Sequence, residues 1–338
     1  MADLPSSGEE QTVRAAVRRH LGSEVRAVEK LTGRAGRRVF IVRLPDREVV
    51  LKVLNARKSR AVGCDFAVDA LRRAGAPTPR VLAVDRSGRY EGEFFDYPFL
   101  ILEKAEGMPM DQWLLERKPN LADRRAVLRR LGEILRRVHT VRVAKGWGNL
   151  DDDGIGRFNS WSEYLEGQRV RQADGRMVRT LNTAWLEREA LISPEERAGL
   201  DALVQPRSGS DGPADARLVH NDLTLKNVFL DPEDLRITAV LDLHNALAGD
   251  PALDLARFEY FYRGRGHLAG LEAGYGELTE DFQRRRGPLL VFVLLEKIAW
   301  LRGRETRFPG RLEKDVALLR RKVETLARAG AGRPAGGG

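Results

Sequence analysis

The apolar positions of the first hundred residues cluster in short runs rich in β-branched side chains, a pattern typical of strands. Two such runs, 39–44 and 48–54, are separated by polar residues that fit a hairpin turn. Residues 80–85 and 97–104 predict two further strands, and residues 60–75 predict a helix. We therefore expect a small antiparallel sheet with one helix in this part of the chain.

Another helix is expected before this sheet, over residues 11–22. Ser7 and, three positions later, Glu10 form the capping-box pattern that precedes many helices. A Gly-containing loop at 31–38 then leads into the first predicted strand.

After Ala105 the apolar residues recur mainly at helical spacing. Helices are predicted over 122–141, 160–172, 194–204 and 254–262, and more follow towards the end of the chain. Between them lies a short β insert with strands at 216–220, 227–231 and 236–242. The pattern predicts an α+β protein with a β-rich first part and a larger helical second part.

The change of pattern near residues 103–106 marks a candidate hinge. We expect one unit over residues 1–103, a second over 104–328, and a frayed Gly-rich tail over 329–338.

Composition excludes several classes of protein. Apolar residues make up 42% of the 338 residues, so the chain is not of a disordered type. Cys64 is the only cysteine, which excludes an internal disulfide framework and a cysteine-based metal site. The longest apolar run, 289–295, is much shorter than a membrane span. We expect a soluble cytoplasmic protein with no membrane partner.

The formal net charge of +9 raises the question of an anionic partner. The Arg residues are spread along helix-like segments beside Glu and Asp, which is typical of a solvated surface. We therefore expect no nucleic-acid partner.

The candidate chemistry lies in two stretches, "LVHNDLTLKN" at 218–227 and "AVLDLHN" at 239–245. Asn227 opens one strand of the β insert and Asp242 ends the strand that pairs back in a hairpin, so the two side chains should lie close together. Asp222 is on the same loop as Asn227. Two carboxylates and an amide oxygen facing one point suit Mg²⁺ completed by phosphate oxygens.

His-x-Asp, four residues, Asn, a hydrophobic strand, a turn, a second strand and then Asp is the order found in protein-kinase-like catalytic loops. The stretch "LVHNDLTLKNVFLD…RITAVLDLHNALAGDPALDLARF" resembles the aminoglycoside phosphotransferase family, a small-molecule branch of the kinase-like fold. "LTGRAGRRVFIV", "VVLKV", "GAPTPRVL", "PFLILEKAEG" and "LGEILRRVHTV" extend the resemblance over about residues 28–260. It implies a bilobal protein-kinase-like fold, with a small β-rich N-lobe and a larger, mostly helical C-lobe.

The resemblance also implies roles for individual residues. Asp222 would orient the acceptor hydroxyl and take its proton, and Asn227 and Asp242 would hold Mg²⁺ against the nucleotide phosphates. Lys52 would pair with the α- and β-phosphates. Lys226 would neutralise charge on the moving phosphoryl group or face solvent.

Further residues would support these or bind the nucleotide, ATP or GTP. His220 and Asp254 would brace the catalytic loop, Asp250 would belong to the scaffold, and His139, His244 and Asn245 would have no part in the chemistry. The family pairs the strand lysine with a helix Glu, but residues 60–75 contain none. Asp65 is therefore the expected partner, Asp69 is the second candidate, and the remaining alternative is that the pair is absent. The nucleotide-binding set is Gly33 and Gly36 in the loop, Glu103 and Ala105 at the hinge, and Val39, Val50, Phe229 and Leu241 around the base.

The implied function is transfer of the γ-phosphate of ATP or GTP to a hydroxyl of a small-molecule acceptor, with an antibiotic, aminoglycoside or nucleoside-type, as the leading acceptor. The alternative is a metabolic kinase acting on choline, homoserine, methylthioribose or a sugar amine. Residues 151–154, Glu163, Glu166 and Glu259 could form an acidic face for a polycationic acceptor, or be ordinary surface. A catalytically dead scaffold is a third interpretation, and the protein is expected to be a monomer or a homodimer.

Overall fold

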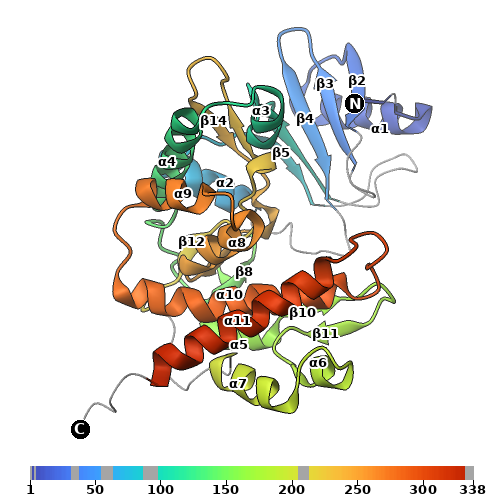
Figure 1. Cartoon of the computed structure of the whole chain (residues 1–338). Helices are drawn as coiled ribbons and strands as arrows, with labels where there is room; N and C mark the ends of the chain where they lie inside the picture. Colours follow the sequence, from blue (N-terminus) through green and yellow to red (C-terminus); the bar gives the residue numbers. More distant parts are fainter. Residues whose placement is uncertain are drawn as a thin grey trace.

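The computed structural model describes residues 2–3, 5–31, 38–54, 64–86, 98–204 and 213–331. A β-rich N-terminal region, in blue at the upper right of Figure 1, stands above a larger and mostly helical C-terminal region. The predicted α+β class is confirmed. The exact division of the chain at residues 103 and 104 stays a prediction.

A six-stranded antiparallel sheet forms the N-terminal region, in the order β1-β2-β3-β4-β6-β5. Its strands are β1 (Ala2–Asp3), β2 (Ala27–Leu31), β3 (Val39–Arg43), β4 (Glu48–Val53), β5 (Val81–Asp85) and β6 (Phe99–Glu103). The last four match the predicted strands, whereas the pattern does not predict β1 and β2.

The two faces of this sheet carry different residues and have different surroundings, because successive side chains of a strand point to opposite faces. One face packs on helix α1 (Ser7–Leu21), and its fully buried members are Phe40, Val42, Val49 and Leu51, which join Val13, Ala16 and Val17 of the helix. The alternate residues Val39, Val50 and Lys52 are half-buried on the other face. The β3–β4 register places Val39 opposite Lys52.

Helix α1 begins one residue earlier than its predicted capping box. Ser6 is the N-cap and accepts a hydrogen bond from the Glu9 N–H, and the Glu9 carboxylate accepts one from the Ser6 N–H at 3.2 Å. The expected pair, Ser7 and Glu10, is therefore wrong by one position, because two successive Ser-x-x-Glu patterns overlap here.

Helix α2 (Cys64–Arg73) belongs in sequence to the first part of the chain but packs elsewhere. Its buried residues Ala67, Val68 and Leu71 join the main hydrophobic core together with residues of the C-terminal region. α2 therefore lies between the sheet and the C-terminal helices (Figure 1).

The C-terminal region contains helices and three small sheets. Its helices are α3 (Met110–Glu116), α4 (Leu121–Val138), α5 (Trp161–Gly167), α6 (Ala184–Arg188), α7 (Pro194–Val204), α8 (Ala252–Tyr262), α9 (His267–Tyr275), α10 (Glu280–Leu301) and α11 (Arg311–Ala331). Its sheets are β12 (Arg217–Val219), β15 (Leu247–Gly249), β8 (Trp147–Leu150) and β9 (Gly156–Phe158) in that order, then β14 (Ile237–Val240), β13 (Val228–Leu230) and β7 (Met108–Pro109), and the pair β10 (Arg169–Arg171) and β11 (Met177–Arg179).

Two predicted elements need correction. The helix expected over 160–172 ends at Gly167, and 169–171 form strand β10. The predicted hairpin forms from β13 and β14, and β12 pairs with β15. Helix α11 continues to Ala331, three residues into the predicted tail, and residues 332–338 lie outside the described residues.

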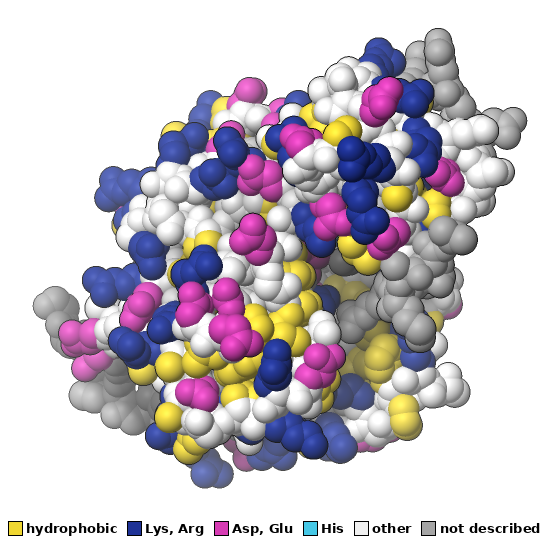
Figure 2. All heavy atoms as spheres, turned by 90° about the horizontal axis from the view of Figure 1, so that it is seen from above, with side chains coloured by type: hydrophobic (Ala, Val, Ile, Leu, Met, Phe, Trp, Pro, Cys, Tyr) yellow, Lys and Arg dark blue, Asp and Glu magenta, His cyan; other side chains and the backbone are white. Residues whose placement is uncertain are grey.

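Helix α8 is almost wholly buried and α10 packs against it. The buried charged residues of α8, Asp254 and Arg257, are thereby held at fixed positions in the middle of the C-terminal region. None of the described helices is long and apolar enough to cross a membrane. Seen from above, Lys and Arg side chains are spread over the surface among Asp and Glu, in line with the expected solvated charge (Figure 2).

Candidate active site

The loop that follows β12 is held by one buried carboxylate. Asp254 accepts hydrogen bonds from the backbone N–H groups of His220 and Asn221, at 2.8 and 2.7 Å, and its Oδ2 lies 3.0 Å from the Nε2 of His139. Burial raises the pKa of Asp254, but the hydrogen bond and charge of His139 and the contacts with His220 outweigh it and hold the pKa below its ordinary value. Asp254 thus braces the loop that follows β12, as the sequence predicts.

His220 connects this loop to the second motif. Its Nδ1 accepts the N–H of Asp222 at 3.3 Å, and its Nε2 lies 3.0 Å from the carbonyl oxygen of Leu241. An amide can only donate and a carbonyl can only accept, so a neutral ring with its proton on Nε2 satisfies both partners. With both ring nitrogens engaged, His220 is a structural brace and not an acid or base.

The hairpin β13–β14 brings Asn227 and Asp242 together as predicted. Val228 pairs with Val240, and the N–H of Leu241 donates to the carbonyl oxygen of Asn227 at 2.8 Å. The Nδ2 of Asn227 donates in turn to the carbonyl oxygen of Asp222 at 3.0 Å. Asp222, Asn227 and Asp242 therefore belong to one small cluster.

Asp242 also links the cluster to the N-terminal sheet. Its carboxylate accepts hydrogen bonds from Lys52 and from the Nδ1 of His244. Burial raises the pKa of Asp242, but the His244 hydrogen bond and the Lys52 charge outweigh it and hold the pKa well below its ordinary value. The carboxylate is therefore ionised at neutral pH.

A lysine paired with an ionised carboxylate, an amide and a second carboxylate are the parts of a phosphoryl-transfer site. A model of the phosphotransferase enzyme family matches residues 27–288, more than half of the chain. The chain belongs to the phosphotransferase enzyme family. The resemblance seen in its motifs is thereby confirmed.

Solved structures similar to this phosphotransferase share its fold. A thermostable mutant of aminoglycoside phosphotransferase APH(4)-Ia, solved in complex with ADP and hygromycin B, is 18% identical and has a TM-score of 0.65, covering 95% of this chain and 100% of the other. A candidate fructosamine-3-kinase from Thermobifida fusca is 20% identical with a TM-score of 0.59, covering 94% of this chain and 99% of its own. The kinase-like fold predicted from the sequence is confirmed.

A curated relative is the acyl-CoA dehydrogenase family member 10 of Mus musculus, which is 24% identical over 233 residues. The match takes up 64% of this phosphotransferase but 18% of the mouse protein, so the chain spans less than a fifth of that relative's length.

The structure does not bring Asp65 to Lys52. Asp65 accepts a hydrogen bond from Arg86 at 2.7 Å, and Arg86 also contacts Asp152 at 2.9 Å. Because α2 packs into the main core, its first turn meets the end of β5 and not the face that carries Lys52. In this phosphotransferase the partner of Lys52 is Asp242, and the predicted Lys52–Asp65 pair is wrong for this structure.

The other residues of the predicted nucleotide site fall into three groups. Val39 and Val50 share the sheet face of Lys52, and Phe229 and Leu241 are half-buried beside the cluster. Glu103 ends β6, where its carboxylate accepts from Arg80 at 2.8 Å, and the described part of the chain offers the Ala105 N–H no hydrogen-bond partner. Gly33 and Gly36 lie outside the described residues.

Two side chains of the loop that follows β12 are left without partners among the described residues. The carboxylate of Asp222 accepts no hydrogen bond there, and the amine of Lys226 makes neither a hydrogen bond nor an ion pair. Both residues are half-buried. A free carboxylate at this place is what an acceptor hydroxyl would need, whereas the role of Lys226 stays open.

The donor set of Asn227 and Asp242 fits a hard divalent cation such as Mg²⁺. Asp242 is ionised, and Asn227 uses its Nδ2 on the Asp222 carbonyl oxygen, which leaves its Oδ1 for a cation. Within the described ranges no three His, Cys, Asp or Glu side chains form a metal-binding group. A cation here would therefore depend on phosphate oxygens, as Mg²⁺ in nucleotide sites does.

Sequence reasoning missed His244, Asn245 and Arg257. His244 donates to Asp242, and the carbonyl oxygen of Asn245 accepts from Asn221 at 3.0 Å. Arg257 is buried in α8 and its Nε donates to the Asn221 Oδ1 at 2.7 Å. An Arg three positions after Asp254, inside a mostly apolar helix, was the available signal for this contact.

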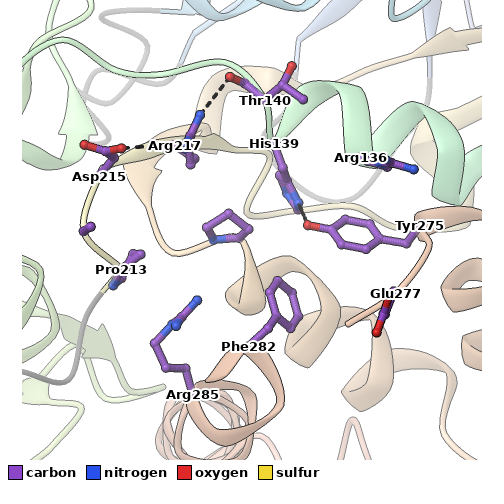
Figure 3. A pocket seen from close by; sticks show the side chains of 12 residues that line it. Arg136, His139, Thr140, Pro213, Asp215, Arg217, Tyr275, Glu277, Phe282 and Arg285 are labelled. Atoms are coloured by element: carbon purple, nitrogen blue, oxygen red, sulfur yellow. Dashed lines mark hydrogen bonds and ion pairs between the residues drawn. The ribbon is translucent and has the colours of Figure 1, made fainter. Parts of the chain in front are cut away.

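A cavity of about 610 Å³ lies outside this cluster (Figure 3). His139 and Tyr275 line it and meet through the Nδ1 of His139 and the Tyr275 hydroxyl at 2.8 Å. None of the predicted site residues lines it. This cavity is thus not the place where the predicted site residues lie.

Proposed function

We propose that the protein is a kinase that transfers the γ-phosphate of ATP or GTP to a hydroxyl group of a small molecule. The observation that carries the proposal is the unpartnered carboxylate of Asp222 beside Asn227 and Asp242, with Lys52 reaching across from the N-terminal sheet. All four parts required for phosphoryl transfer are present, which argues against a catalytically dead scaffold.

In this mechanism Asp222 accepts a hydrogen bond from the acceptor hydroxyl and aims its oxygen at the γ-phosphorus. The new O–P bond forms as the bond from phosphorus to the β–γ bridging oxygen breaks, and that oxygen leaves with the nucleoside diphosphate. The hydroxyl proton passes to Asp222. Because the transition state is loose and proton loss is late, the main contribution of Asp222 is to position the acceptor hydroxyl.

The phosphates would be bound by the residues around Asp242. Lys52 would exchange part of its contact with Asp242 for the α- and β-phosphates, while Asn227 and Asp242 would hold Mg²⁺, which neutralises phosphate charge. Lys226 stands on the same loop and is proposed to face the transferred phosphoryl group, with a solvent-facing position as the alternative.

The base would lie between the two regions. Val39 and Val50 from the sheet and Phe229 and Leu241 from the C-terminal region supply apolar surfaces of the kind that enclose a purine. The backbone at Glu103 and Ala105 would meet the base edge, and Gly33 and Gly36 would approach the phosphates.

The charges of the described residues bear on the acceptor. Glu259 contacts Lys322 at 2.8 Å and also pairs with Arg286, Asp152 pairs with Arg86, and Glu163 accepts the N–H of Asn159 at 2.9 Å. Most of the acidic face considered for a polycation is thus occupied by the chain's own donors. This favours a neutral or anionic acceptor, such as a nucleoside-type antibiotic or a phosphorylatable metabolite, over an aminoglycoside.

The test is a ³²P transfer screen with ATP and with GTP. Its panel contains aminoglycosides, including hygromycin B, nucleoside antibiotics, choline, homoserine, methylthioribose and fructosamines. We expect labelled product with at least one neutral or anionic acceptor and none without Mg²⁺. No transfer to any of them, together with no nucleotide binding, would contradict the proposed function; rapid transfer to aminoglycosides alone would contradict the assignment of the acceptor.

A further inference from the structure

The residue before the proposed catalytic base has an unusual backbone. Asn221 has φ 62, in the left-handed region that few residues other than Gly adopt. Such a conformation is unfavourable for a non-Gly residue and persists only where its surroundings enforce it. Because Asn221 and Asp222 share a peptide bond, whatever enforces the conformation also sets the direction of Asp222.

Three contacts enforce it, and they come from two different elements. The N–H of Asn221 donates to Asp254 at 2.7 Å, its Oδ1 accepts from the Nε of Arg257 at 2.7 Å, and its Nδ2 donates to the carbonyl oxygen of Asn245 at 3.0 Å. The first two come from helix α8, and the third comes from the turn that begins at Asp242. Asn221 therefore fixes the catalytic loop relative to the proposed metal site.

Arg257 is itself held by a second helix. Its guanidinium, 6% exposed, forms a two-point ion pair with Glu296 of α10 at 2.7 and 3.4 Å. Burial lowers the pKa of Arg257, but the charge and hydrogen bond of Glu296 outweigh it and raise the pKa above its ordinary value. A buried ion pair of this kind often adds little net stability, because desolvation offsets the attraction.

The guanidinium of Arg257 is better suited to orienting Asn221 than to stabilising the fold. Its planar fork is fixed by the two oxygens of Glu296, so its Nε–H can point in one direction only, towards Asn221. The chain Glu296–Arg257–Asn221 thus runs from α10 through α8 to the peptide that carries Asp222.

We propose that Arg257 and Glu296 are positioning residues that, through Asn221, aim the Asp222 carboxylate at the acceptor hydroxyl. The inference rests on the proposed function of Asp222. It assigns no contact of Arg257 or Glu296 with the nucleotide, so their loss should lower kcat and leave nucleotide binding intact.

Steady-state kinetics of four variants test the proposal. Arg257→Lys, Glu296→Gln and Asn221→Gly should each lower kcat about 10–100-fold, because small misplacements of a reacting group have effects of this size, with the nucleotide KM within about twofold of the wild type. Gly tolerates the left-handed conformation, so Asn221→Gly removes the side-chain contacts without backbone strain. Asn221→Asp keeps an oxygen for Arg257 but sets a second oxygen against the carbonyl oxygen of Asn245, so its kcat should lie between those of the wild type and Asn221→Gly.

A double variant of Asn221 and Arg257 distinguishes a positioning role from a general disturbance of the fold. If Arg257 acts through Asn221, the double variant Asn221→Gly with Arg257→Lys should lose no more activity than the stronger single variant. The matched control is Arg263→Lys, which weakens the contact with Asp315, at 2.8 Å, of the arginine that directly follows α8, without touching the loop. It should leave kcat unchanged. Unchanged kcat in the three variants, or additive losses, would overturn the inference.

Hydrogen exchange gives a readout that does not depend on turnover. The backbone N–H groups of residues 220–227 should exchange faster in Arg257→Lys than in the wild type and in Arg263→Lys. If the wild type transfers no phosphate to any acceptor, the proposed function fails, and exchange alone decides the inference. Equal exchange in all three proteins would then contradict it.

Discussion

Lys52 of β4 and Asp242 at the end of β14 form an ion pair although 190 positions separate them in the chain. The pair joins the N-terminal sheet to the C-terminal cluster, and its side chains are 19% and 7% exposed. In the proposed function both residues bind the phosphate end of the nucleotide, Lys52 directly and Asp242 through Mg²⁺. The pair thus marks the place where the two regions would close on the nucleotide.

The first prediction concerns Lys52. Lys52→Met keeps most of the length of the side chain but removes its charge, and we expect the nucleotide Kd to rise about 10–100-fold, since a hydrogen bond to a charged group contributes roughly 1.5–3 kcal/mol. Isothermal titration with a non-hydrolysable ATP or GTP analogue measures this. Lys30→Met is the matched control, because Lys30 of β2 pairs with Glu9 at 2.8 Å away from the cluster. A Kd that does not change in Lys52→Met would remove Lys52 from the nucleotide site.

The second prediction concerns the metal. Nucleotide should raise the melting temperature of the wild type more with Mg²⁺ than with EDTA, because a ligand that binds only the folded state stabilises it. Asp242→Asn should lose the Mg²⁺-dependent part of this rise in melting temperature and keep the part that nucleotide causes in EDTA. The same Mg²⁺ increment in Asp242→Asn and in the wild type would show that Asp242 does not hold the cation.

The third prediction concerns the brace beneath the loop. Asp254→Asn would turn an NH₂ group towards donors, and we expect the free energy of unfolding at pH 7 to fall by about 3 kcal/mol. The pKa of Asp254 in the folded protein lies below its ordinary value of 3.8, so its stabilisation is complete above that pH and is lost as the pH falls below it. Urea unfolding between pH 7 and pH 3 should therefore show the difference between wild type and variant shrinking in acid. A difference that grows in acid would have the wrong sign for this carboxylate.

The fourth prediction concerns the packing of α4 on α9. A Cβ on Gly274 would lie 1.7 Å from the carbonyl oxygen of Arg129, so Gly274→Ala must move the helices apart and should cost about 1–3 kcal/mol or more. In helix α7 a Cβ on Gly199 would make an ordinary contact at 3.6 Å, and Gly199→Ala should stabilise by about 0.4–1 kcal/mol. Denaturant unfolding measures the free energy of unfolding of both variants. Equal effects of the two substitutions would contradict the close approach of α4 and α9.

Local patterns predict much of the catalytic cluster because a hairpin needs only local pairing. The spacing from Asn227 to Asp242 follows from two strands and a turn, and the structure has this register. The bracing roles of His220 and Asp254 are likewise confirmed by their hydrogen bonds. Asp250 also belongs to the scaffold, since it accepts from Arg285 at 2.7 Å and from the N–H of Ala252 at 2.9 Å.

The sequence predictions fail where packing between distant elements decides which residues meet. No local pattern shows that α2 packs into the main core, and this packing leaves Asp65 with Arg86 and Lys52 with Asp242. The strands β8 and β15 are short, and they pair across almost a hundred residues, Leu247 with Asn149. In the sequence, Arg257 and Glu296 resemble ordinary charged residues on helix surfaces, and no local pattern shows that they form a buried ion pair.

The central claim is that Asp222 is the base of a phosphoryl transfer. The most direct measurement is the rate of ³²P transfer to the best acceptor by the wild type and by Asp222→Asn, with nucleotide affinity measured on the same samples. We predict a kcat about 10²–10⁴-fold lower in Asp222→Asn, with the nucleotide Kd unchanged. Transfer at the wild-type rate by Asp222→Asn would contradict the account.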